Sequence, residues 1–337
     1  MDAGMKSDNG KSMPGVGKSE YLRVPIPRGL DLRAEIERLR KEKNAVILSH
    51  YYQDESVQDV ADFIGDSLGL SQQASGTQAD IIVFAGVYFM AETAKILNPS
   101  KKILLPDLNS GCSLADSCTA ESLSQFKSKY PDHIVVSYIN CSAKVKALSD
   151  LVCTSANAEK IINSIPADRE IIFVPDKNLG RYLVRKTGRD MKLWDGSCVV
   201  HEAFSIQKLL DLHQQHPEAL IVAHPESEEH ILRVANYVGS TSGMIDFVAR
   251  SSGSTFLVAT EAGILHQMQK AVSGKTLIPA PVNENNTCAC SECASMRLST
   301  LEKIYKCLKY ELPEVNVPED VAEKALKPIR RMLELSV

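Results

Sequence analysis

The chain has 337 residues, of which 44% are hydrophobic and 24% are charged, and its formal net charge is -4. That length is too great for one ordinary domain and predicts two or three. The composition is typical of a soluble globular protein, and a slightly acidic chain gives no reason to expect nucleic acid as a partner. No apolar run approaches the ~20 residues of a membrane-spanning helix, so we expect no membrane partner.

The N-terminal segment is poor in apolar side chains and rich in Gly, Ser and Lys. It predicts a disordered tail over residues 1–20, and it lacks the apolar core of a secretory signal peptide. Nine cysteines without an export signal indicate a reducing, cytoplasmic location. In that compartment, cysteines are expected as core thiols, metal ligands or catalytic groups rather than as disulfides. An odd number of cysteines also cannot pair completely within one chain.

Short apolar runs alternate with helical patterns along the chain. A helix capped by Asp31 should end near residue 44, and the first buried strands are predicted at 45–49, 81–85 and 102–105. The scheme recurs with strands at 134–138, 151–153, 171–174 and 192–194, and again at 220–223, 237–238, 256–259 and 276–278. Helical patterns at 298–308 and from about residue 318 follow. Continuous apolar runs between helices predict an α/β fold with short parallel sheets covered on both faces.

This repeat divides the chain into three similar α/β/α units, although it is a repeat of pattern and not of residue identity. The units are predicted at 21–112, 113–198 and 199–293, and the C-terminal helices at 294–337 are expected to join the first. Polar residues cluster where the strands end, and ligands of such folds bind beyond the carboxyl ends of strands. Three units around a pseudo-three-fold axis would place these residues around one central cavity.

Three cysteines, Cys112, Cys198 and Cys293, each follow one such unit. Together they would supply three thiolates, one fewer than the four ligands that usually close a four-iron cluster or a structural zinc site. A buried core thiol is the alternative for any single cysteine, and it suits Cys153 and Cys307 better than a cysteine in a polar loop. A local zinc site on the Cys-x-Cys-x-x-Cys run at 288–293 is a weaker alternative, because a second close pair is missing.

Other polar residues at strand ends are candidates for chemistry. His50 is followed by two tyrosines, and His224 and Glu226 would share a face of an extended segment as an acid–base pair. A structural histidine and a solvated loop are the respective alternatives. Ser67 and Ser155 lie at expected helix starts, where an N-cap is the simpler explanation, and Gly239–Gly243 resembles a small anion cradle.

Read together, these stretches resemble the quinolinate synthases, iron–sulfur enzymes of de novo NAD biosynthesis. The resemblance spans about residues 30–310 and rests on SHYYQ (49–53), GDSLGLS (65–71), GVYFMAETAKIL (86–97), LPDLNSGCSLADSC (105–118), SYIN (137–140), FVPDKNLGRY (173–182), DGSCVVHEAF (195–204), AHPE (223–226), GSTSGM (239–244), FLVATEAGILH (256–266) and MRLSTLEKIYKCL (296–308).

The resemblance implies condensation of iminoaspartate with dihydroxyacetone phosphate to quinolinate, phosphate and water. It implies a [4Fe-4S] cluster on Cys112, Cys198 and Cys293 with one open iron as Lewis acid. Tyr52 and Glu226 are implied as proton-transfer groups, with His50 and His224 also at the reacting centre. The residues implied to contact substrate are His50, Ser67, Tyr138, Asn140, Ser155, His224, Glu226 and Thr241.

Three positions depart from the family pattern. The last ligand motif usually reads Cys-Pro-x-Met, and here Ala294 stands in place of the proline. Cys141 follows the Tyr-x-Asn motif where Thr or Ser is common, and Ala85 stands where Cys is frequent. The first change is expected to loosen a loop, and the last to affect packing only.

Several alternatives stay open at this point. One is a non-catalytic metal or redox sensor on the same fold, and another is an iron–sulfur hydro-lyase acting on a hydroxy-dicarboxylate. Cys288, Cys290 and Cys293 are close enough in sequence for a regulatory disulfide. L-aspartate oxidase, which would supply iminoaspartate, is a possible functional partner.

Overall fold

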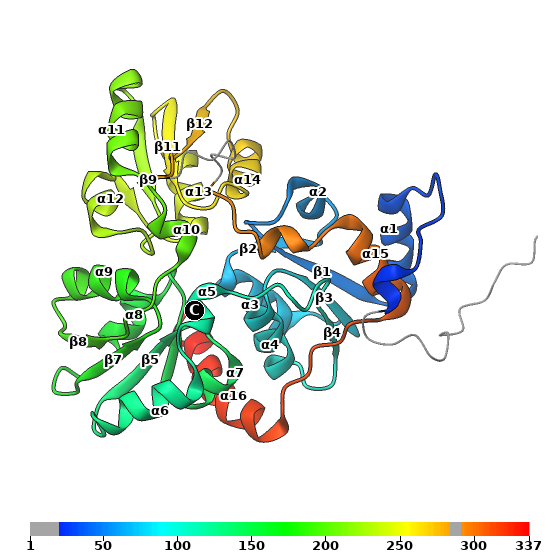
Figure 1. Ribbon diagram of the computed structural model, residues 1–337, viewed down its shortest axis with the longest axis horizontal. Coiled ribbons are helices and arrows are strands. Elements are labelled where there is room, and N and C mark those ends of the chain that lie inside the picture. The colour runs from blue at the N-terminus through cyan, green and yellow to red at the C-terminus, as the bar shows by residue number, and fades with distance from the viewer. Residues whose placement is uncertain (1–19, 284–290, 337) are drawn as a thin grey trace, which may run out of the picture.

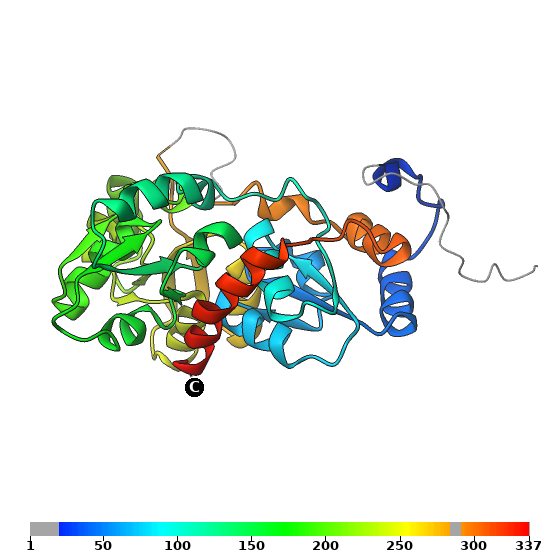
Figure 2. The same cartoon turned by 90° about the horizontal axis from the view of Figure 1, so that it is seen from below.

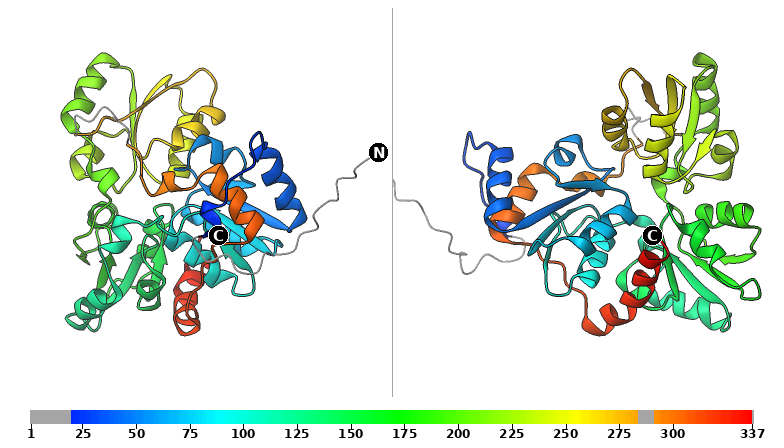
Figure 3. Two further views of the ribbon diagram at one scale, coloured as in Figure 1. Left: turned by 45° about the vertical axis from the view of Figure 1, so that its right-hand side comes forward. Right: turned by 180° about the vertical axis from the view of Figure 1, so that it is seen from behind.

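The computed structural model describes residues 20–283 and 291–336. Residues 1–19 of the tail expected over 1–20, together with Cys288 and Cys290 and any disulfide that they form, lie outside the described residues, and Glu20 begins the 3-10 helix η1. In the described part, the chain forms three four-stranded parallel sheets with helices packed on them. The views in Figure 1 and Figure 3 show three lobes, each built on one sheet, around a central junction. The predicted fold class, three α/β units with short parallel sheets, is therefore confirmed.

The first sheet has the strand order β2-β1-β3-β4. Its strands are β1 (Ala45–His50), β2 (Phe63–Gly65), β3 (Ile81–Ala85) and β4 (Lys102–Leu104). The surrounding helices are η1 (Glu20–Arg23), α1 (Leu32–Glu42), α2 (Glu55–Gln58), α3 (Ser67–Gly76) and α4 (Tyr88–Leu97). Side chains alternate along β1, so that Ile47 packs toward α1 while Leu48 packs toward α3 and α4. The sequence did not predict β2, because it is a short edge strand without an apolar run.

The second and third sheets repeat this order, as β6-β5-β7-β8 and β10-β9-β11-β12. The second contains β5 (Ile134–Tyr138), β6 (Leu151–Cys153), β7 (Ile171–Val174) and β8 (Met191–Leu193), with α5 (Ser113–Asp116), α6 (Ala120–Ser128), α7 (Ala143–Ala147), α8 (Ala158–Asn163) and α9 (Lys177–Thr187). The third contains β9 (Leu220–Ala223), β10 (Tyr237–Val238), β11 (Thr255–Ala259) and β12 (Thr276–Pro279), with α10 (Val199–Glu202), α11 (Ile206–Gln215), α12 (Glu229–Val234), α13 (Thr241–Arg250) and α14 (Ile264–Ala271).

The strand registers make the three sheets equivalent residue by residue. Ser49 pairs with Ile64 on one side and Ala85 on the other. In the second sheet Ser137 pairs with Val152 and Val174, and in the third Ala223 pairs with Val238 and Ala259. Residues at the same distance along the chain from these positions are therefore structurally equivalent in the three sheets, although their identities differ.

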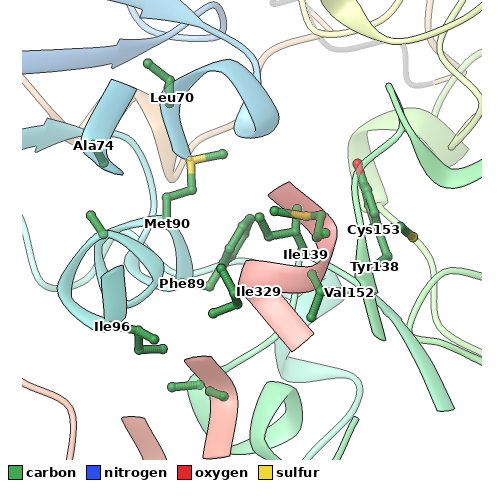
Figure 4. Close-up of a cluster of buried hydrophobic side chains, with 14 of the residues drawn as sticks. Leu70, Ala74, Phe89, Met90, Ile96, Tyr138, Ile139, Val152, Cys153 and Ile329 are labelled. Carbon is green, nitrogen blue, oxygen red and sulfur yellow. The ribbon is translucent and has the colours of Figure 1, made fainter. Parts of the chain in front are cut away.

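The C-terminal helices have different partners. After η2 (Met296–Leu298), α15 (Leu301–Tyr310) packs against α1 and β3 of the first sheet. The last helix, α16 (Glu319–Glu334), drawn in red in Figure 2, lies between α4 on one side and α7 and β6 on the other, so it contacts the first and second units together. Figure 4 shows Ile329 of α16 among Phe89, Ile139 and Val152. The domain boundaries given above stay a prediction, but α16 joins two units and not the first alone.

Among the described residues, none of the helices combines the length and the apolar character needed to cross a bilayer.

Candidate active site

One cavity opens where the carboxyl ends of the strands of all three sheets converge. Its empty volume, including space open to solvent, is about 670 Å³. All twelve residues proposed from the sequence line it, namely His50, Tyr52, Ser67, Cys112, Tyr138, Asn140, Ser155, Cys198, His224, Glu226, Thr241 and Cys293. The structure thus brings these residues together, while their individual roles stay predictions.

The three-fold equivalence explains why these positions meet. The residue after the register position is His50, Tyr138 or His224, and two residues later the chain carries Tyr52, Asn140 or Glu226. Each register position pairs with a residue of the strand that comes second in its unit, β2, β6 or β10. Three residues after that partner, the chain carries Ser67, Ser155 or Thr241, respectively. The three cysteines follow the last strand of each sheet. Each of these sets of three equivalent residues therefore contains one residue from every unit of the fold.

The two strand-end histidines share one local arrangement. Nδ1 of His50 accepts the backbone N–H of Tyr52 at 3.2 Å, and Nδ1 of His224 accepts that of Glu226 at 3.4 Å. Each ring therefore carries its proton on Nε2, which for His224 lies 3.1 Å from Oγ of Ser155. Burial lowers the pKa of both imidazoles to about 3 against the opposing charge of Glu226, so both are neutral donors near pH 7.

Glu226 is buried at the centre of this group and accepts several hydrogen bonds. The phenol of Tyr138 donates to Oε1, and Nδ1 of His201 lies 3.2 Å from Oε2. Burial alone would raise the pKa of Glu226, but His201 and His224 outweigh it and hold the pKa below its ordinary value. Asp176, also buried, has its pKa raised by burial and then by the charge of Glu226, so Asp176 is the more readily protonated of the two carboxyl groups.

Tyr52 is uncharged, whereas Glu226 is ionised. Its phenol oxygen lies 2.6 Å from Oγ1 of Thr260. Burial, together with the nearby charge of Glu226, raises the pKa of Tyr52 well above its ordinary value. The cavity therefore holds a neutral phenol and an ionised carboxylate, which are a proton donor and a proton acceptor.

The three cysteines line the same cavity, as a metal centre shared by them would require. Each is partly buried, and each is a free thiol in the structure. Burial raises the pKa of Cys112 to about 12, and it also raises that of Cys198 and of Cys293, whose charges interact with Cys112. Such thiols stay protonated until a cation displaces the proton, which is the usual coupling of metal binding to proton release. Cys198 also lies close to His201 and Glu226, whose ligand atoms are within 4.8 Å of one another.

A buried acceptor on the cavity wall also indicates a ligand. Oδ1 of Asn140 is buried and, among the described residues, has no hydrogen-bond partner. A buried amide oxygen without a partner costs free energy unless a ligand or water satisfies it. This observation favours a polar ligand beside Asn140.

Comparisons with known proteins identify the family of this chain. The family model described as quinolinate synthetase A protein matches residues 34–334 of this chain. Quinolinate synthase from Microcystis aeruginosa is 61% identical over 306 residues, which are 91% of this chain and 95% of that protein. The quinolinate synthases of Thermosynechococcus vestitus and Synechocystis sp. are 59% and 57% identical, over 93% and 92% of this chain and 97% and 96% of theirs. The chain belongs to the quinolinate synthase family.

Among solved structures, the E-1-hydroxy-2-methyl-but-2-enyl-4-diphosphate reductase from Plasmodium falciparum is 13% identical, with a TM-score of 0.30. It covers 76% of this chain and 88% of its own. A TM-score this low supports no inference about fold or function.

The departures from the quinolinate synthase pattern lie in distinct surroundings. Ala85 packs in the buried cluster between the first sheet and α1, and Cys141 is buried beside Val145 and Ile172. At the third cysteine, Oε1 of Glu261 accepts the backbone N–H of Cys293 at 3.2 Å and pairs with Arg297 at 2.9 Å. Glu261 therefore holds the loop from which the usual proline is missing.

Sequence reasoning missed several residues of this cavity. His201, Glu261 and Asp66 all line it. His201 lies three residues after Cys198, within a motif already matched to the family, and that spacing is the signal that was overlooked. Glu261 and Asp66 follow strand ends at positions equivalent to Asp176 and Ser240, which only the registers reveal.

Proposed function

We propose that this protein condenses iminoaspartate with dihydroxyacetone phosphate to form quinolinate, phosphate and water. The observation that carries the proposal is the convergence of strand ends from three sheets on one cavity with neutral hydrogen-bond donors, an ionised carboxylate and three thiols. Membership of the quinolinate synthase family supports the same reaction. We also propose that the reaction takes place in the cytoplasm, where a reducing environment preserves thiols.

Cys112, Cys198 and Cys293 would hold a [4Fe-4S] cluster, with one thiolate from each unit. When bound, the cluster would supply an open iron as a Lewis acid. The chain supports such a bulky group, because small residues precede two of the thiols and the cavity is spacious. A Cβ on Gly196 would lie 2.4 Å from the carbonyl oxygen of Pro175, so the loop that carries Cys198 requires a glycine there.

The substrates and the product carry carboxylates, and the cavity wall offers donors for them. Nε2–H of His50 is available at one strand end, while that of His224 is donated to Ser155, whose own hydrogen is left for a ligand. The hydroxyls of Ser67, Ser155 and Thr241 lie at or near the starts of α3, α8 and α13. Charge-assisted hydrogen bonds of this kind bind carboxylates well, and helix N-termini add favourable partial charge. These residues would orient the dicarboxylate.

Tyr52 and Glu226 would move the protons of the tautomerisation and dehydration steps. Glu226, held ionised, would take a proton from the substrate, and the phenol of Tyr52 would donate one to a departing oxygen. Tyr138 and His201 hydrogen-bond to Glu226, so the carboxylate has a fixed orientation for that step.

The test is an anaerobic assay that supplies iminoaspartate and dihydroxyacetone phosphate together and measures quinolinate and phosphate. Equal amounts of both products support the proposal. A metal or redox sensor would give neither product. An iron–sulfur hydro-lyase would instead dehydrate a hydroxy-dicarboxylate such as malate without dihydroxyacetone phosphate. Supplying L-aspartate, L-aspartate oxidase and an electron acceptor such as fumarate in place of iminoaspartate tests the proposed source of that substrate.

A further inference from the structure

The three units meet one another through equivalent pairs of helices. In each unit a helix begins six residues after the register position, and these helices are α2, α7 and α12. Each packs on the helix that follows the third strand of a neighbouring unit, so α2 contacts α14, α7 contacts α4 and α12 contacts α9. Figure 1 shows each pair at a boundary between two lobes. The equivalence of the sheets therefore extends to the interfaces between the units.

The same two positions face each other at every interface. The ninth residue after the register position lies in the first helix of each pair, and the fourth residue after its partner in the third strand lies at or near the start of the second helix. In the order given above, these pairs are Gln58 with Gly263, Lys146 with Phe89, and Leu232 with Asn178. Each pair contains one side chain that can donate a hydrogen bond.

Gln58 donates across the interface between the first and third units. Its Nε2 lies 3.0 Å from the carbonyl oxygen of Tyr51, 2.8 Å from that of Gln53 and 2.9 Å from that of Gly263. Its Oε1 accepts Nε2–H of Gln267 at 2.9 Å. Carbonyl oxygens only accept hydrogen bonds, so the NH₂ group must face the three of them. One carboxamide thus holds the turn after β1 against the start of α14.

The donors at the other two interfaces also bind main-chain carbonyl groups. The ammonium of Lys146 donates to the carbonyl oxygen of Cys141, which is the structural equivalent of Gln53. Nδ2 of Asn178 donates to the carbonyl oxygen of Glu226 at 3.2 Å. In all three cases the acceptor belongs to the turn that directly follows the first strand of a unit. The three units therefore solve the same structural problem with different side chains.

These three donors are buried outside the cavity wall. Gln58 is 1% exposed, Lys146 is 0% exposed and Asn178 is 4% exposed, and none of them lines the cavity. The ammonium of Lys146 lies 5.2 Å from the centre of the Phe89 ring, and its charge opposes the effect of burial, which raises the pKa of Glu92. Water cannot replace a donor at such sites, so its loss leaves a carbonyl group unsatisfied.

We propose that Gln58, Lys146 and Asn178 are positioning residues, each of which fixes the turn that presents one polar group to the cavity. The turns carry Tyr52, Asn140 and Glu226, respectively. This inference rests on the proposed function, which assigns roles to those three groups. Because each donor acts on the main chain of a single turn, its loss should impair the function of that turn and leave the functions of the other two.

Lys146 gives a test with a matched control. Lys146→Met and Lys146→Gln both remove the charge that faces Glu92, but only glutamine keeps a donor, in the geometry that Gln58 has at the equivalent position. The turn carries Asn140, a proposed substrate contact, so we expect Lys146→Met to raise the Kd for quinolinate at least fivefold and Lys146→Gln to stay within about twofold of wild type. Calorimetric titration measures both. If Lys146→Met does not fold, Lys146→Gln decides alone, and a Kd more than fivefold above wild type would overturn the proposal.

Gln58 predicts the opposite kinetic effect, because its turn carries the proposed proton donor Tyr52. We expect Gln58→Met to lower kcat at least tenfold while the Kd for quinolinate stays within about twofold of wild type. Gln267→Met is the control, since it leaves the NH₂ contacts of Gln58 intact at a partly exposed position, and kcat should stay within about threefold. A merely structural role would change kcat and Kd alike in Gln58→Met and Lys146→Met, and that result would overturn the proposal.

Hydrogen–deuterium exchange of the protein with its cluster in place tests the turns without turnover. The N–H of Cys141 donates to the carbonyl oxygen of Ile139 at 2.8 Å, so its exchange reports on that turn. Exchange over residues 139–143 should be faster in Lys146→Met and unchanged in Lys146→Gln. Wild-type exchange in Lys146→Met, or equal acceleration in both variants, would overturn the inference. An absence of quinolinate formation by the wild type would instead refute the proposed function, and the exchange data would still decide whether the donor fixes the turn.

Discussion

Nε2 of His224 lies 3.1 Å from Oγ of Ser155, and the two residues belong to different sheets. His224 follows β9 in the third sheet, and Ser155 follows β6 in the second. Because Nδ1 of His224 accepts a backbone N–H, the imidazole must donate to Ser155. The hydroxyl of Ser155 is thereby left to donate its own hydrogen into the cavity.

Ser155→Ala should weaken the binding of carboxylates. The lost hydrogen bond to a charged group corresponds to ~1.5 kcal/mol or more, or about a tenfold higher Kd for quinolinate. Calorimetric titration of the wild type and the variant measures this difference. Ser164→Ala, at an exposed serine that caps the opposite, C-terminal end of α8, is the matched control and should bind normally. Equal affinity in Ser155→Ala would remove Ser155 from the binding site.

The buried imidazole of His50 predicts how stability depends on pH. Its pKa is lowered by burial to about 3 in the folded protein, against 6.5 in the unfolded chain. Between these values the unfolded chain binds a proton that the folded protein does not, so the free energy of unfolding falls as pH falls from 6.5 toward 3. One such group contributes a slope of up to about 1.4 kcal/mol per pH unit.

His50→Asn removes this group, so its unfolding free energy should decline less steeply from pH 6.5 to pH 4.5 than that of the wild type. Urea unfolding at a series of pH values measures both slopes. His230→Asn, at an exposed histidine, should keep the wild-type slope. Identical slopes for His50→Asn and wild type would show that His50 takes up its proton in the folded state.

Gly263 is a point of close approach between the first and third units. A Cβ added there would lie 2.9 Å from the carbonyl oxygen of Gln53 and 2.9 Å from the carbonyl carbon of Tyr52. Both neighbours are backbone atoms, so Gly263→Ala must separate the units or displace Tyr52, at a cost of roughly 1–3 kcal/mol. We expect a lower Tm and reduced kcat.

Gly76→Ala is the control for Gly263→Ala, because a Cβ at Gly76 has no atom within 4 Å. Thermal unfolding of both variants, followed by circular dichroism, makes the comparison. A Tm for Gly263→Ala equal to that of the control would mean that this contact is looser than the structure indicates.

Much of this site follows from the sequence, and the reasons are physical. Strands such as 81–85 and 171–174 are continuous apolar runs, and residues just after them must lie at one edge of a parallel sheet. That rule, with the family resemblance, was enough to find twelve residues of the cavity wall. It could not find His201, whose importance depends on which residues from other sheets its two ring nitrogens meet.

The location of α16 could not be predicted from the sequence for a similar reason. Its amphipathic pattern shows that one face is buried, but the pattern does not name the partner. Buried residues such as Ile329 and Met332 pack between two units, which only the tertiary structure shows. In the same way, the loss of proline after Cys293 predicted a looser loop, whereas Glu261 and Arg297 hold that loop from outside the motif.

Glu261→Gln should therefore weaken the hold on Cys293. Oε1 accepts from Cys293 and Arg297 while Oε2 accepts the N–H of Gly263 at 2.7 Å, so an amide must turn its NH₂ group toward a donor. One buried donor is then unsatisfied, at ~1–3 kcal/mol. The expected result is faster loss of iron from the reconstituted protein during dialysis. Glu292→Gln, which also borders Arg297 but is exposed, should retain iron as the wild type does.

The most direct test of the central claim is the iron and acid-labile sulfide content of protein purified without oxygen, measured together with quinolinate formation. We expect about four irons and four sulfides per chain in the wild type. Cys112→Ala, Cys198→Ala and Cys293→Ala should each lose most of the iron and all product formation, while Cys307→Ala, at a buried thiol in a hydrophobic core cluster, retains both. Full iron content and wild-type quinolinate formation in any of the three cavity variants would contradict the account.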